Sequence, residues 1–99
     1  MIRLRTLIAA ALLALLLGAA TVHAQELKGT VKDVYPGQLQ LAVQDLEGNA
    51  HVFKMDEDAQ VYIDGMAGTL DDVRQGDRVA VIYRVDEASL LAIEVRCRH

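Results

Sequence analysis

The stretch from Gly68 to Val81, GTLDDVRQGDRVAV, joins a turn-forming segment to the start of an alternating apolar strand. Thr69 is followed three residues later by Asp72, which resembles a capping box with Asp in place of Glu. We therefore predict one helical turn over residues 70–74, with Gly76 ending it in a left-handed conformation.

The apolar residues of this stretch favour a structural role over a binding role. Leu70 and Val73 lie three residues apart and share one face of the predicted turn, so they can plug the open end of a small barrel. A phosphate-cradling loop needs a lysine after its last glycine, and this stretch contains no lysine. We therefore interpret the stretch as a connection that leads into a strand over residues 78–85.

Alternation with period two predicts the strands. Weaker strands are expected over residues 27–34, 50–55 and 60–63, and Val34 breaks the parity of its run, which indicates a β-bulge. The acidic run 55–58 is expected to be a solvated loop between two strands. The core-facing positions of the well-marked strands are predicted to be Leu39, Leu41 and Val43, then Val79, Val81, Tyr83 and Val85, and finally Leu91, Ile93, Val95 and Cys97.

Short connections separate these strands and predict antiparallel neighbours. Pro36-Gly37, Glu47-Gly48-Asn49 and Asp64-Gly65 have the composition of hairpin turns. Residues 86–88 are too few for a parallel crossover, which needs a dozen or more. The chain is therefore expected to be all-β with a mostly antiparallel sheet.

These features together resemble a group of secreted bacterial domains of unknown function that adopt a small OB-like β-barrel. The resemblance covers nearly all of residues 25–99, and it implies an antiparallel OB-like barrel of five or six strands with one short helical turn. It also implies a binding or scaffolding module with no catalytic residue to carry over. The matching segments are Gly29 to Val31, Asp64-Gly65, Thr69-Leu70 to Gly76-Asp77, and Ala92-Ile93.

The N-terminus has the pattern of a secretory signal peptide, expected as a helix that precedes the barrel. Arg3 and Arg5 precede an apolar run over residues 7–17, which is shorter than the ~20 residues of a spanning helix. The small residues that follow predict cleavage between Ala24 and Gln25. We expect a signal peptide over 1–24, a β-barrel domain over 25–99, and a periplasmic or secreted protein without membrane insertion after cleavage. An uncleaved anchor is the alternative.

The charge of the mature chain argues against nucleic acid. Removal of Arg3 and Arg5 leaves eight Lys and Arg against fourteen Asp and Glu, a formal charge of −6. The mature chain has a single basic pair near its end, Arg96 and Arg98. We therefore expect no cluster of positive charge that could bind a phosphate backbone.

The single cysteine, Cys97, excludes an internal disulfide. The parity of the last strand predicts that its side chain is buried and protected. Its position near the chain end and beside two arginines favours the alternative, a thiol available for an intermolecular disulfide or a metal.

A soft-metal site is the main alternative function. His51 and Met55 have the same parity on one strand and could bind Cu(I) with Met66, Cys97 or His99. Small periplasmic barrels that carry copper use such ligands, but they also use tryptophan, which this chain lacks. The acidic run lacks the spacing of a calcium loop.

Nothing in the sequence predicts catalysis. His51 and His99 are the only histidines after residue 24, and Ser89 has no base near it in sequence. We expect no enzyme, no catalytic residue, no cofactor and no resident metal. The sequence thus favours a non-catalytic binding or interaction module with an envelope protein as candidate partner, and a soft-metal binding protein as the alternative. The oligomeric state is not predicted.

Overall fold

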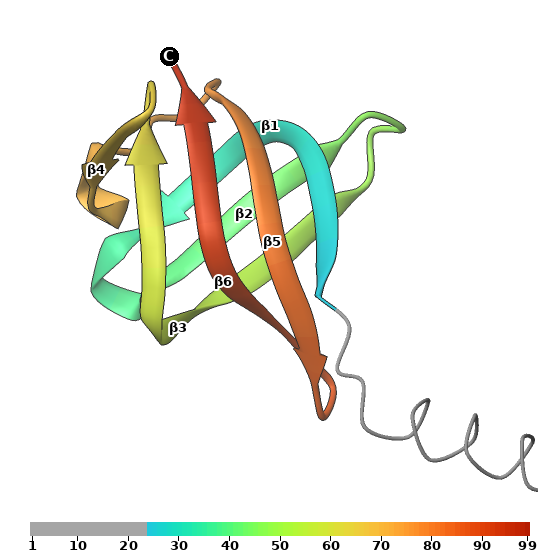
Figure 1. Ribbon diagram of the computed structural model, residues 1–99. Coiled ribbons are helices and arrows are strands. Elements are labelled where there is room, and N and C mark those ends of the chain that lie inside the picture. The colour runs from blue at the N-terminus through green and yellow to red at the C-terminus, as the bar shows by residue number, and fades with distance from the viewer. Residues whose placement is uncertain (1–23) are drawn as a thin grey trace, which may run out of the picture.

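The computed structural model describes residues 24–99 (Figure 1). The predicted signal peptide, except for Ala24, therefore lies outside the described residues, and its cleavage remains a prediction. Within the described part of the chain, no helix is long and apolar enough to cross a membrane.

The described residues form a closed five-stranded barrel with one short extra strand (Figure 1). The strand order is β2-β1-β5-β6-β3-β4, and an additional pairing of β2 with β3 closes the first five strands into a barrel. Among the strands of residues 24–99, only β3 and β6 pair in parallel. This topology confirms the OB-like barrel. The elements are β1 (Gln25–Tyr35), η1 (Pro36–Gln38), β2 (Gln40–Asp45), β3 (Ala50–Ile63), β4 (Met66–Gly68), η2 (Leu70–Asp72), β5 (Arg78–Asp86) and β6 (Ser89–Arg98).

The long first strand serves two neighbours because it bends across the barrel. Its first half pairs with β5 and its second half with β2. The register with β2 shifts between Val31 and Asp33, so Lys32 is the extra residue of a bulge. Val34 thereby returns to the core side and packs against it, which confirms the bulge that its parity indicated.

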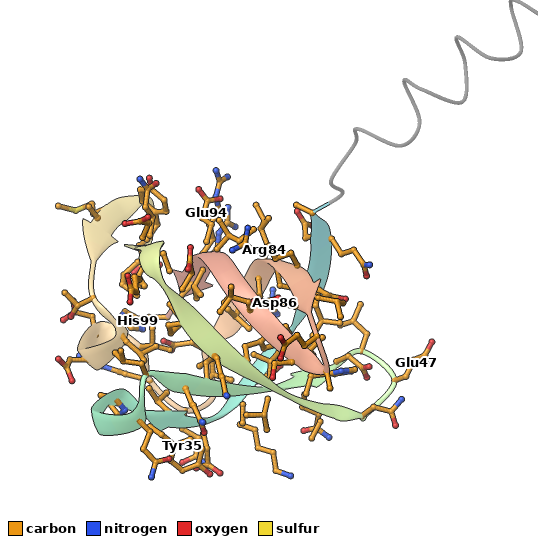
Figure 2. All side chains as sticks on the ribbon, turned by 90° about the horizontal axis from the view of Figure 1, so that it is seen from below. Tyr35, Glu47, Arg84, Asp86, Glu94 and His99 are labelled. Carbon is orange, nitrogen blue, oxygen red and sulfur yellow. The ribbon has the colours of Figure 1, made fainter. Side chains whose placement is uncertain are left out.

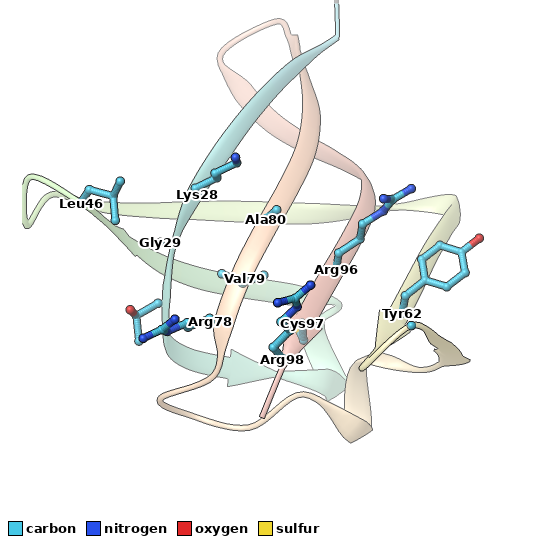
Figure 3. Close-up of a pocket in the computed structure, with 12 residues that line it drawn as sticks. Lys28, Gly29, Leu46, Tyr62, Arg78, Val79, Ala80, Arg96, Cys97 and Arg98 are labelled. Carbon is cyan, nitrogen blue, oxygen red and sulfur yellow. The ribbon is translucent and has the colours of Figure 1, made fainter.

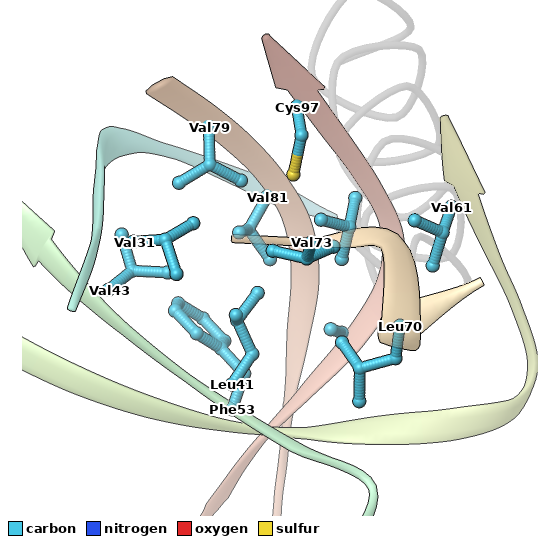
Figure 4. Packing of buried hydrophobic residues seen from close by; sticks show 12 residues of the cluster. Val31, Leu41, Val43, Phe53, Val61, Leu70, Val73, Val79, Val81 and Cys97 are labelled. Atoms are coloured by element: carbon cyan, nitrogen blue, oxygen red, sulfur yellow. The ribbon is translucent and has the colours of Figure 1, made fainter. Parts of the chain in front are cut away.

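One core of apolar side chains fills the barrel (Figure 4). Leu70 and Val73 are both buried and cover one end of it, as expected. The capping interaction is present, because the Thr69 backbone N–H donates to the Asp72 carboxylate at 2.9 Å. The turn is shorter than predicted: Val73 is already extended, and Gly76 adopts its positive φ in a separate turn. The core residues are Val31, Leu41, Val43, Phe53, Val61, Leu70, Val73, Val79, Val81, Ala92, Val95 and Cys97.

Four of the predicted core positions are wrong, each for a local reason. Leu39 ends η1 in a left-handed conformation and is 58% exposed. Leu91 and Ile93 lose their phase because the β5–β6 register shifts at this point, which turns Ala92 inward instead. Val85 is exposed because it lies near the tip of the β5–β6 hairpin, which extends beyond the barrel (Figure 1).

The acidic run is part of a strand, which corrects the predicted loop. Residues 50–63 form the single strand β3, whose early residues pair with β2. Residues 53–55 and 60–63 both pair with β6, and the register shifts between Met55 and Gln60. Between these two segments β3 advances from Met55 to Gln60 while β6 advances only from Ala92 to Glu94, so the intervening residues of β3 form a wide bulge within the strand.

Candidate functional site

A hollow of about 320 Å³ lies at the end of the barrel beside η2, and we call it the end hollow. Two strand pairings place β4 and the end of β6 beside this hollow, because Ile63 of β3 pairs with Met66 on one side and with Cys97 on the other. The chain after Cys97 therefore reaches the hollow as well. The lining residues are Ile63, Met66, Ala67, Gly68, Asp71, Asp72, Arg74 and His99.

His99 follows β6 and lines the end hollow, and two polar contacts hold it there. Its Nδ1 lies 2.9 Å from an Asp77 carboxylate oxygen, and its backbone N–H donates to Asp64 at 3.3 Å. When neutral, a ring that donates from Nδ1 keeps a lone pair on Nε2. A carboxylate behind a histidine is the arrangement that orients imidazole ligands in metal sites.

Asp77 is the buried anchor of this arrangement, with 6% of its surface exposed. Burial alone would raise the pKa of its carboxyl. The hydrogen bonds from His99 and from the Arg74 backbone N–H outweigh burial and hold that pKa below its usual value. The carboxylate is thus charged at neutral pH and keeps His99 in place.

Met66 supplies the accessible soft donor. It lies on β4, lines the end hollow and is 74% exposed. The Asp72 carboxylate accepts a hydrogen bond from the Thr69 backbone N–H. Asp71 and Arg74, which carry opposite charges, also line the hollow. A thioether and an oriented imidazole are ligands that soft monovalent ions select. Among the described residues there is no group of three or more His, Cys, Asp or Glu that could hold a metal ion.

His51 and Met55 do not form the predicted pair. Four residues of strand separate their Cα atoms by about 13 Å at the usual rise per residue. Phe53 lies between them with its side chain fully buried, and Met55 packs against the core. These two side chains therefore cannot bind one ion together, which corrects the ligand set proposed from the sequence.

His51 belongs instead to the β2–β3 hairpin. Its Nε2 lies 2.8 Å from an Asp45 carboxylate oxygen, and the same carboxylate accepts the N–H groups of Glu47 and Asn49 at 2.9 and 2.8 Å. The hydrogen bond from His51 is the main cause of the lowered pKa of Asp45. Glu47 at the hairpin tip and His99 lie on opposite sides of the molecule, so the two histidines are separate (Figure 2).

Cys97 is buried as predicted, with 2% of its surface exposed and its sulfur turned into the core (Figure 4). Burial, followed by the charges of Asp77 and Asp64, raises the pKa of the thiol to about 12. The thiolate is the metal ligand and the nucleophile. Cys97 is therefore not available as a ligand in the folded protein.

We expect the folded protein to resist thiol-specific reagents at Cys97. At mildly alkaline pH a thiol with this pKa is almost entirely protonated, and its sulfur is covered. Labelling followed by mass spectrometry should be many-fold slower in buffer than in denaturant. Equal rates, or a dimer that reductant dissolves, would show that the end of β6 opens.

We expect acid to destabilise the fold through Asp77 and Asp45. Both carboxyls have lowered pKa values in the folded state, so their stabilisation is present above the unfolded pKa of about 3.9 and is lost as the pH falls through the folded values. The melting temperature should therefore fall between about pH 5 and pH 3. Asp77→Asn should reduce that fall, whereas Asp86→Asn on an exposed hairpin should not. An unchanged acid profile for Asp77→Asn contradicts the assignment.

Comparisons with known proteins support the fold. No family model and no curated protein matches the chain at the sequence level. Among solved structures, the chain is similar to apo-CusF from Escherichia coli, with 11% identity and a TM-score of 0.62 over 81% of this chain and 93% of that one. It is also similar to the Ag(I) complex of CusF from the same organism, with 11% identity and a TM-score of 0.63 over 82% and 99%. At this identity the likeness concerns the barrel, not the ligands.

Sequence reasoning named Met66 and His99 as accessory ligands without placing them together. They are far apart in the chain, and no motif spacing links them. The parallel pairing of β3 with β6 joins them, because it aligns the C-terminal ends of those two strands. That pairing joins strands distant in sequence, so local patterns do not reveal it.

Proposed function

We propose that this chain is a non-catalytic binding domain of the bacterial envelope, exported by its N-terminal signal, and that it binds a soft monovalent metal ion, Cu(I) or Ag(I). The observation that carries the proposal is the shared position of Met66 and His99 at the end hollow, with His99 held by a buried carboxylate. The ion is the cargo of the domain.

The donor chemistry supports this choice of ion. Thioether sulfur and imidazole nitrogen favour Cu(I) over hard cations such as Ca²⁺ or Mg²⁺. Monovalent copper and silver accept low coordination numbers, so two protein donors suffice for a site that must also release its ion. The open position of Met66 suits such exchange, because the thioether is accessible to an incoming ion.

The fold adds independent support. The silver complex of CusF has a similar barrel, so a small domain with this type of fold can bind a soft monovalent ion. This chain has no tryptophan and is 11% identical to CusF, so the proposed ligands are its own Met66 and His99.

The test is a titration of the mature protein with Ag(I), followed by native mass spectrometry. We expect one ion per chain, with binding lost in both Met66→Leu and His99→Gln. His51→Gln is the matched control, because His51 has the same pairing with an aspartate, whereas Met55, the thioether on its strand, packs against the core. Cys97→Ala should retain the ion. Loss of silver in His51→Gln, or unchanged binding in Met66→Leu, refutes the proposed site.

A further inference from the structure

A second hollow, of about 1120 Å³, covers the outer face of β1, β5 and β6, and we call this surface the basic face (Figure 3). It lies on the outside of the barrel wall, and its edges carry Leu46 and Tyr62. The cationic residues that line it are Lys28, Arg78, Arg96 and Arg98. They are half of the eight cations in residues 25–99, gathered on one side of an acidic domain.

This cluster corrects the expectation that the chain lacks a positive face. Arg96 and Arg98 are visible as a pair in the sequence, but Lys28 and Arg78 come from distant strands. Thr30 pairs with Arg78 and Arg78 with Arg98, which makes one row across the three strands. Strand register therefore builds the surface.

In the neighbouring row of paired residues, nearby carboxylates partly neutralise the positive charge. In that row Ala80 lies between Lys28 and Arg96, and its small side chain leaves room between the two cations. Lys28 approaches Glu26 at 3.6 Å, and Arg96 binds Glu94 at 2.8 Å. These carboxylates come from the next row along the same face.

Arg78 and Arg98 have no such partners. They lie directly opposite each other on antiparallel strands, and within residues 24–99 neither forms an ion pair. The nearby Asp64 carboxylate accepts the His99 backbone N–H instead. Like charges directly opposite each other on a sheet are destabilising. The fold thus retains a repulsive arginine pair on a surface that has no internal use for it.

We propose that the basic face docks an acidic segment of another protein, whose carboxylates bind between Arg78 and Arg98. Guanidinium groups bind carboxylates with two parallel hydrogen bonds, which suits a pair of arginines across two strands. Tyr62 contacts Arg96 with its ring 5.8 Å from the guanidinium carbon, and Arg with Tyr is typical of protein interfaces.

The overall charge of the domain decides between a protein segment and larger polyanions. The formal charge of −6 repels an extended nucleic acid or a strongly anionic membrane, both of which present charge far beyond this face. A short acidic segment meets the local positive charge and extends over the apolar edges of the hollow. The basic face shares no lining residue with the proposed metal site at the end of the barrel.

The experiment uses acetylated hexaglutamate as the probe and isothermal titration calorimetry at low ionic strength. We expect binding by the mature wild-type protein, and affinity at least tenfold weaker in the double variant Arg78→Gln with Arg98→Gln. Arg84→Gln, with a cation on the exposed part of β5, is the matched control and should bind as wild type.

Melting temperature supplies the second readout. The double variant should melt no lower than wild type, because it removes a repulsive pair rather than a stabilising contact. Unchanged affinity in that variant overturns the proposal, as does the absence of binding to wild type. Tighter binding of duplex DNA or of phosphatidylglycerol vesicles than of hexaglutamate overturns the assignment to a protein segment.

Discussion

Leu41→Asp is expected to unfold the domain. Leu41 is fully buried in the core, and a carboxylate at its position would have no partner. An unpaired buried charge costs about 3–5 kcal/mol, while a core of this size supplies roughly 3–5 kcal/mol of net stability. Circular dichroism of the purified variant should show no cooperative thermal transition.

Gln40→Asp is the matched control for that substitution. It changes the adjacent residue of β2, whose side chain is not part of the core, so the melting temperature should change little. Equal effects of the two variants would mean that the faces of β2 are assigned wrongly.

Gly29→Ala is expected to have the second largest effect on stability. Gly29 lies where β1 passes from β5 to β2, and a Cβ there would stand 2.1 Å from the Gln44 carbonyl oxygen. That oxygen belongs to the backbone of the partner strand, so the clash cannot be relieved by a side-chain rotation. We expect a loss of about 3 kcal/mol or more, above the usual range for overpacking.

Gly37→Ala tests whether this loss is specific to the strand crossing. A Cβ at Gly37 would meet nothing within 4 Å, and its φ is not positive. The free energy of unfolding, measured with urea, should change by roughly 0.5 kcal/mol or less. If both glycines tolerate alanine equally, the close approach of β1 to β2 is wrong.

The sequence predicts the barrel well where side chains alternate without interruption. The broken parity at Val34 predicts the bulge in β1, and the spacing of Thr69 and Asp72 predicts the turn that covers the core. Cys97 is assigned correctly because no register shift separates it from Val95. Each of these features depends on residues that are close in the chain.

The failures arise where tertiary structure changes the phase of a strand. Ile93 is the extra residue at the register shift between β5 and β6, and Leu39 takes its conformation from the turn before β2. The acidic residues 56–58 belong to a bulge of β3, because the segments on both sides of them pair with nearly adjacent residues of β6. None of these causes is visible in the local pattern of apolar and polar residues.

The two proposed surfaces bind different ligands. The end hollow offers Met66 and His99 to an ion, whereas the basic face offers Arg78 and Arg98 to a protein. Both depend on strand pairings between distant segments. The two hollows have no lining residue in common, so each proposal is tested by its own substitutions.

The most direct test of the metal site is the methyl spectrum of the protein labelled with ¹³C at its methionine methyl groups. Residues 25–99 contain only two methionines, Met55 and Met66, so each signal can be assigned by substitution. On addition of one equivalent of Ag(I), we predict that the Met66 methyl signal shifts and that the Met55 signal, from a side chain packed against the core, stays in place. A shift of Met55 alone, or of neither signal, would contradict the proposed site.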